Sequence, residues 1–160
     1  MNPVARLVEP LKRRVRLMVS RGVLRLVDDA RKVQEAQVGL LRDEVVSGVE
    51  RFQEYGLTSV PLPGCEGVLV FVGGSRGHGL LVATDDRRYR PTALEPGEVM
   101  IYDHLGKFVH LRANGDVHVS AGRVVIDADV VINGDVEVDG NVHATGTIVD
   151  DAGNTNHHTH

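Results

Sequence analysis

Apolar positions change their spacing several times along the chain, and the first pattern is helical. In residues 3–20 they recur at three- and four-residue steps, as one face of an α-helix requires. Proline inside a helix removes a hydrogen bond, so we expect the regular helix to begin after Pro10 and to end near Gly22. The sequence therefore predicts an amphipathic helix within residues 1–21.

Residues 22–98 show short apolar runs separated by Gly- and Pro-containing turns. The runs fall at 23–27, 33–41, 68–72 and 80–83, and residues 44–53, which also fit a helix, are assigned to a strand. The run 68–72 is apolar throughout, which is typical of a fully buried strand. Several short strands with such turns predict a small barrel of the OB type. Residues 99–121, with two hairpin-like turns, form a neck after it.

Residues 122–149 repeat with a strict six-residue period, and glycines keep the same interval at the turns. This period is the signature of a β-solenoid in which each hexapeptide makes one short strand and one turn. The two apolar positions of each repeat are separated by one residue, so they point the same way from a strand. The predicted core positions are Val124, Ile126, Val130, Ile132, Val136, Val138, Val142 and Ile148.

The small number of repeats predicts an oligomer. About four hexapeptides would complete barely more than one coil of a single-chain solenoid, and repeat structures need neighbours to bury their apolar faces. Three chains that each supply one side of every layer solve this problem. We therefore expect a homotrimeric, intertwined β-helix, and the fold class is mainly β with an N-terminal helix.

Residues 150–160 end in His158-Thr159-His160 and are predicted to form a metal-binding apex. His158 and His160 share one face of an extended tail, so three chains would bring six imidazoles around one axis. Six nitrogen donors suit an octahedral ion better than tetrahedral zinc. Iron, one ion per trimer, is the first choice, and other transition metals such as nickel or cobalt are alternatives.

Charge and cysteine content add two limits. The first 25 residues hold seven basic side chains and one acidic one, although the whole chain carries a net charge of −4. A basic arm on an acidic body suggests docking on an acidic protein, and no nucleic acid is expected. Cys65 is the single cysteine, which excludes an intrachain disulfide, and we interpret it as a small buried side chain.

Two segments resemble functional motifs without meeting their requirements. The loop at residues 73–79 lacks the ending of a phosphate-binding P-loop and is interpreted as a hairpin loop. Residues 84–90, Thr-Asp-Asp-Arg-Arg-Tyr-Arg, are interpreted as a solvated or intersubunit cluster of ion pairs.

Several stretches resemble the Mu-like baseplate spike proteins, the baseplate assembly protein V group of contractile-tailed phages and R-type tailocins. They are residues 21–23, 49–56, 71–74 and 83–90, the last being the most specific. The resemblance covers nearly the whole chain. It implies a homotrimer with an OB-fold, a β-helical needle and a pointed apex, with iron held by His158 and His160. It also implies a non-enzymatic spike under the tail tube, assembled in the host cytoplasm, that pierces the outer membrane of the target cell when the sheath contracts.

Two other functions are consistent with parts of this pattern. Hexapeptide repeats also build trimeric acyltransferases, and His143 would be the candidate catalytic residue. Four repeats, however, are too few for the cofactor groove between subunits. An OB module that binds oligonucleotides or glycans is the second alternative, but no two aromatic residues of the barrel are spaced as an exposed stacking platform.

Overall fold

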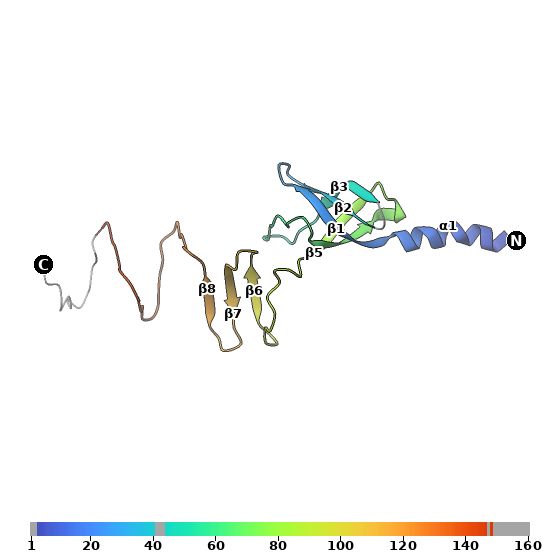
Figure 1. Cartoon of the computed structure of the whole chain (residues 1–160). Helices are drawn as coiled ribbons and strands as arrows, with labels where there is room; N and C mark the ends of the chain where they lie inside the picture. The colour runs from blue at the N-terminus through green and yellow to red at the C-terminus, as the bar shows by residue number, and fades with distance from the viewer. Residues whose placement is uncertain (1–2, 41–43, 147, 149–160) are drawn as a thin grey trace. The chain divides into compact units, whose positions relative to one another are not determined.

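The computed structural model describes residues 3–40, 44–146 and 148. The chain divides into two compact units, residues 1–122 and 123–160, which are described separately. In chain order the described residues of the first unit form an N-terminal α-helix, a barrel and a three-stranded sheet (Figure 1).

The N-terminal helix α1 spans Pro3–Leu17 and leads almost directly into the first strand. The expected boundaries were wrong: Pro10 lies inside the helix, and Gly22 lies in β1, which begins at Val19. Pro10 is exposed, so water can hydrate the carbonyl that its ring leaves without a donor. Gly22 is required by close packing, since an added Cβ would lie 2.5 Å from a side-chain carbon of Val38.

Five strands close into a barrel in the order β1-β2-β3-β5-β4. Their bounds are Val19–Asp28 (β1), Gln34–Gly39 (β2), Val45–Arg51 (β3), Glu66–Phe71 (β4) and Gly79–Asp85 (β5). All pairs are antiparallel except β3 with β5, whose parallel pairing closes the barrel. A five-stranded barrel with this order is OB-like, as the sequence predicts. The assignment of residues 44–53 to a strand is confirmed by β3 over most of that segment.

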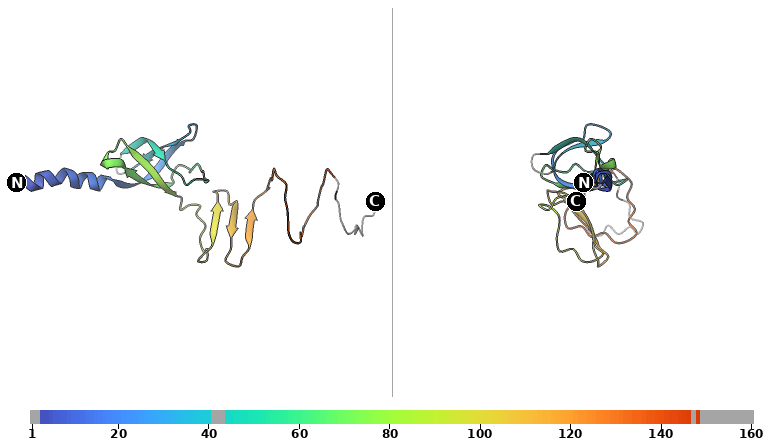
Figure 2. Two further views of the ribbon diagram at one scale, coloured as in Figure 1. Left: turned by 180° about the vertical axis from the view of Figure 1, so that it is seen from behind. Right: turned by 90° about the vertical axis from the view of Figure 1, so that its right-hand side faces the viewer.

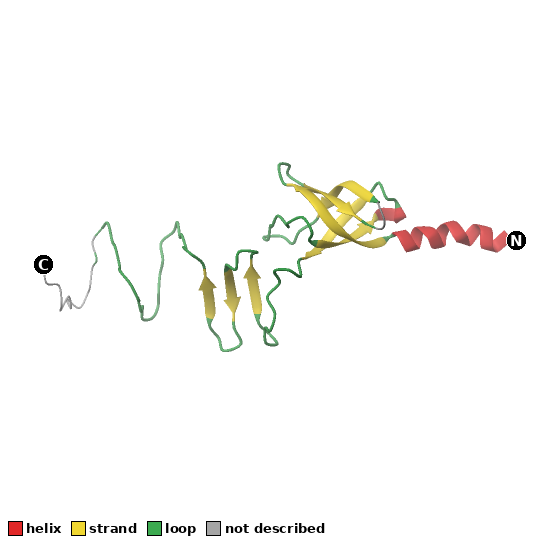
Figure 3. Cartoon of the chain, viewed as in Figure 1, coloured by secondary structure: helices red, strands yellow, loops and turns green. Residues whose placement is uncertain are grey.

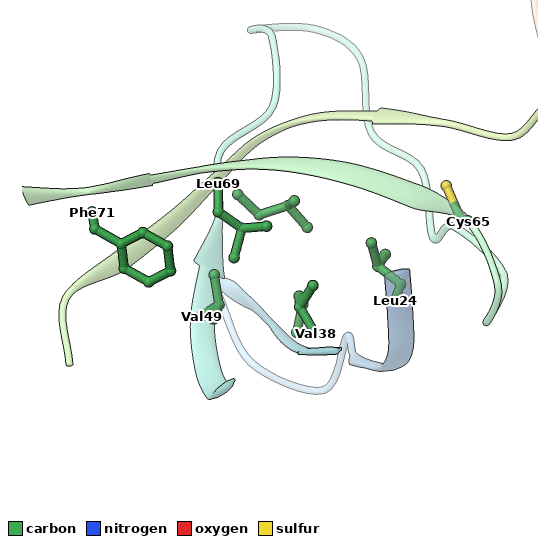
Figure 4. Packing of buried hydrophobic residues seen from close by; sticks show 8 residues of the cluster. Leu24, Val38, Val49, Cys65, Leu69 and Phe71 are labelled. Carbon is green, nitrogen blue, oxygen red and sulfur yellow. The ribbon is translucent and has the colours of Figure 1, made fainter. Parts of the chain in front are cut away.

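The barrel interior is filled by aliphatic side chains and one aromatic ring (Figure 4). Each strand contributes alternate residues, because successive side chains of a strand point to opposite faces. The largest fully buried side chains are Phe71, Leu24, Leu69, Leu81, Val38 and Val49. Cys65 is buried at the edge of this core, which confirms its interpretation as a small buried side chain.

The apolar run 68–72 is not buried on both faces within one chain. Leu69 and Phe71 point into the core, whereas Val68 and Val70 are only half-buried on the outside of β4. Val72 already lies in the short 3-10 helix η1, Val72–Gly74. The loop 73–79 then returns the chain to β5, which agrees with its interpretation as a hairpin loop.

The neck is a separate antiparallel sheet in the order β6-β7-β8, with bounds Val99–Tyr102, Phe108–Leu111 and Val117–Ser120. Figures 2 and 3 show its three short strands side by side. The turns at 103–107 and 112–116 form the two hairpins that the sequence predicts.

The described residues of the second unit form no strands. Residues 123–146 run without backbone pairing, and the predicted core positions are between 51% and 72% exposed. The solenoid therefore stays a prediction, since one chain alone supplies no second side to cover these side chains.

Candidate assembly surfaces and metal-binding residues

The neck sheet has one face made entirely of aliphatic side chains, which we call the aliphatic neck face. Two cross-strand rows form it, Val99–Leu111–Val117 and Ile101–Val109–Val119. Five of the six side chains are exposed and Val109 is half-buried. Exposed apolar rows of this kind mark a surface that another chain or segment covers.

The opposite neck face carries polar and aromatic groups. Phe108 makes edge-to-face contacts with His110 and His118, at ring-centroid distances of 6.3 and 5.1 Å. Nδ1 of His118 lies 2.8 Å from a guanidinium nitrogen of Arg112. This face therefore tolerates water, so the two sides of the sheet differ sharply in polarity.

Hydrogen bonds to the carboxylate of Glu98 stabilise the start of the neck. The carboxylate accepts hydrogen bonds from the backbone N–H groups of Ala113 and Glu95, both at 3.1 Å, and lies 3.0 Å from Nε2 of His110. These contacts favour the ionised carboxylate, and the backbone N–H of Ala113 does most to hold the pKa of Glu98 below its ordinary value. Sequence reasoning missed this residue, because two of its partners, His110 and Ala113, come from the following hairpin.

A second polar cluster fixes the long loop between β3 and β4. Arg51 donates to Oε1 of Gln34 at 2.8 Å and to the backbone oxygen of Ser59 at 2.6 Å. Gln34 is 5% exposed and donates to Asp29 and to the same Ser59 oxygen. Burial lowers the pKa of Arg51, although Cys65 and Asp29 oppose that shift. The spacing of these residues in the sequence gives no signal of this cluster.

The charged run 84–90 forms ion pairs within the chain. Arg87 and Arg21 both pair with the carboxylate of Glu66, and Arg88 pairs with Asp86 at 2.6 Å. The hydrogen bonds from Arg88 lower the pKa of Asp86. The interpretation of this run as a cluster of ion pairs is confirmed, and its contribution between subunits stays a prediction.

The contact between α1 and η1 holds the C-terminal end of the helix against the barrel. Gly74 has φ +73° and lies against Arg14, whose backbone oxygen would be 2.6 Å from an added Cβ. Phe71 donates its backbone N–H to the carbonyl of Met18 at 2.7 Å. The helix is therefore tied to the barrel near its C-terminal end, while Leu11 and Val15 remain exposed.

The predicted metal ligands His158 and His160 lie outside the described residues. Within the described ranges, no three His, Cys, Asp or Glu side chains are grouped as a metal site would require. The iron prediction therefore rests on the sequence of the C-terminus. No described helix has the length and apolarity needed to cross a bilayer.

Fold and surfaces together define an OB-barrel protein with an exposed aliphatic sheet and a hexapeptide tail. Residues 21–88 match the family described as Bacteriophage Mu Gp45, N-terminal. The chain is 50% identical to the baseplate puncturing device gp45 of Escherichia phage Mu, over 78% of its own length and 63% of that protein. It is 40% identical to the Mu-like prophage FluMu protein gp45 of Haemophilus influenzae, over 81% and 70%.

The chain belongs to the gp45 family of Mu-like phage baseplate proteins. It spans less than two thirds of the length of the Mu protein. The resemblance found in the sequence is thereby confirmed, and the matched family region runs from within β1 to just beyond β5.

Proposed function

We propose that this protein is the structural central spike of a contractile-tail baseplate. It is a homotrimer that carries a metal ion at its C-terminal tip and penetrates the outer membrane of the target cell when the sheath contracts. The aliphatic neck face carries this proposal. The name of the Mu relative, a baseplate puncturing device, supports the mechanical function.

The aliphatic neck face would be covered by the corresponding apolar positions of the other subunits. Its last strand, β8, ends at Ser120, and the hexapeptide core positions begin at Val124. The apolar positions of the neck are thus followed almost at once by those of the needle. Each aliphatic side chain that passes from exposed to buried contributes about 1.5–3 kcal/mol at most, and three chains bury these positions around a common axis.

A trimer also solves the problem of sheet edges. In the described chain β6 and β8 each pair on one side, with β7, and leave their other edges open. Open edges invite aggregation and weaken a rod under load, whereas strands of neighbouring chains cover them in an intertwined rod. A rod of this kind transmits axial force and has no open strand edge from which a strand could separate.

The metal ion would join the three C-termini. His158 and His160 provide two imidazoles per chain, so a trimer provides the six nitrogen donors of an octahedral site, with iron as the first candidate. Binding to the folded trimer adds to its stability, because the unfolded chains do not hold the ligands together. The ion would hold the histidine segments of the three chains together at the tip.

The other end of the chain would face the tail. Helix α1 carries exposed Lys12, Arg13 and Arg14, which suit an acidic surface of the hub or tube. The proposed protein acts mechanically. The alternative of oligonucleotide binding receives no support from the outward positions of β2 and β3, which include Glu35 and Glu50.

Light scattering and elemental analysis of the untagged full chain test the proposal. We expect a trimer with one transition-metal ion for three chains. His158→Ala with His160→Ala should release the ion and lower the melting temperature, whereas His143→Ala, in the repeat, should leave the metal content unchanged. A monomer would refute the spike proposal, and a metal-free trimer that the double substitution does not affect would refute the metal site.

A further inference from the structure

The barrel has a second apolar surface on the outside of β1, β4 and β5. Leu24, Leu69 and Leu81 point inward from these strands, so the neighbouring positions point outward. The strand register aligns them in three rows, Val19–Val70–Leu80, Arg21–Val68–Ala83 and Val23–Glu66–Asp85. We call this surface the outer barrel face.

Most of the outer barrel face is apolar and open to solvent. Val19 is 60% exposed and Val23 46% exposed, while Val68, Val70 and Leu80 are half-buried. The apolar run of β4 is typical of a strand covered on both faces, yet only its inner face is fully buried within the chain. The outer side therefore has the composition of an interface rather than of a solvated sheet.

The charges on this face include both signs. Arg21 and Arg87 converge on Glu66, and Asp85 lies at the end of the same row. Two cations and two carboxylates nearly cancel. A polyanion would meet as many repulsive as attractive charges here, whereas a second barrel with the same groups can pair with them.

A second copy is also the partner with the highest local concentration. Val99 begins the neck soon after Asp85 ends β5, so copies joined through their necks hold their barrels on short tethers. Short tethers of this kind give effective concentrations on the order of millimolar, at which even a weak apolar contact forms.

We propose that the outer barrel face packs against the barrel of a second copy of this chain, with Val19 and Val23 buried in the contact. The inference rests on the proposed oligomer and extends it, because it places subunit contacts in the barrels as well as in the neck and needle. The ion pairs of Arg21 and Arg87 with Glu66 then lie at the contact, as the residues 84–90 suggest.

Thiol labelling of the full chain tests this contact. Val23→Cys introduces a thiol on the outer barrel face, and Val33→Cys is the matched control, because Val33 is 48% exposed and lies in the turn before β2. Val19→Cys is a second test position. The wild-type protein gives the background, since its native Cys65 is buried. Each variant is checked by circular dichroism and light scattering before it reacts with a maleimide.

In the assembled protein, we expect the thiols at positions 19 and 23 to react about tenfold more slowly than the thiol at 33, because a covered thiol reacts only when the contact opens. Equal rates in a trimer overturn this inference and leave the spike proposal intact. Equal rates in a monomer, identified by light scattering, overturn both.

Discussion

Arg51→Met should open the loop between β3 and β4 while leaving the barrel folded. The substitution removes the donors to Oε1 of Gln34, to the backbone oxygen of Ser59 and to the Ser59 hydroxyl at 2.9 Å. The backbone oxygen of Ser59 still accepts a hydrogen bond from Gln34. The main loss of stability therefore comes from Oε1 of Gln34, which loses its donor although the Gln34 side chain is only 5% exposed.

An unsatisfied buried acceptor costs about 1–3 kcal/mol. We take about 2 kcal/mol for the loss of local stability, which corresponds to roughly a thirtyfold faster opening of the loop.

Amide hydrogen exchange read by mass spectrometry measures this opening locally. Two reporters are the amide of Ser59, which donates to the Gln53 side chain, and the amide of Gly64, which donates to Leu24. Arg31→Met is the control, since its ion pair with Glu35 is exposed and such pairs contribute about 0.2–1 kcal/mol. Exchange in residues 52–65 that is equally fast in the two variants would refute the reasoning.

Three further predictions concern the core, the helix and the neck. Leu69→Ala should lower the barrel's free energy of unfolding, measured in urea, by about 2–5 kcal/mol. Leu26 is exposed, so Leu26→Ala should lower it by far less. Similar losses in the two variants would contradict the placement of Leu69 in the core. Gly74→Ala should speed amide exchange in α1, because the added Cβ would clash with the helix backbone at Arg14. Gly73→Ala is the control: Gly73 has a similar φ but open space around it, so this variant should leave the exchange in α1 unchanged. Since the pKa of Glu98 is lowered in the folded state, its contribution to neck stability is complete above the unfolded-state pKa and is lost as the pH falls through the folded value. Glu98→Gln should therefore flatten the acid side of the neck's stability profile, and an unchanged profile would count against the carboxylate contacts.

Local periodicity in the sequence was enough to predict most of the secondary structure. The spacing of apolar residues predicted the strands, the barrel type and the neck hairpins, and the hexapeptide period together with His158 and His160 predicted the needle and its metal. The residues 83–90 were specific enough to indicate the family. The needle and the metal stay predictions, since they depend on contacts between chains and on residues outside those described.

Which side chains meet across long separations follows from the fold and not from the sequence pattern. Glu98 finds a backbone donor at Ala113, and Arg51 meets Gln34 and Ser59, because strand pairing brings distant segments together. The helix ended earlier than its pattern suggested, since Gly22 was needed for packing inside β1 rather than for a helix end. Side-chain alternation, finally, divided the apolar run of β4 into an inner half that one chain buries and an outer half that it leaves half-buried. Periodicity identifies apolar positions, but what covers them depends on the partner that the fold brings to each face.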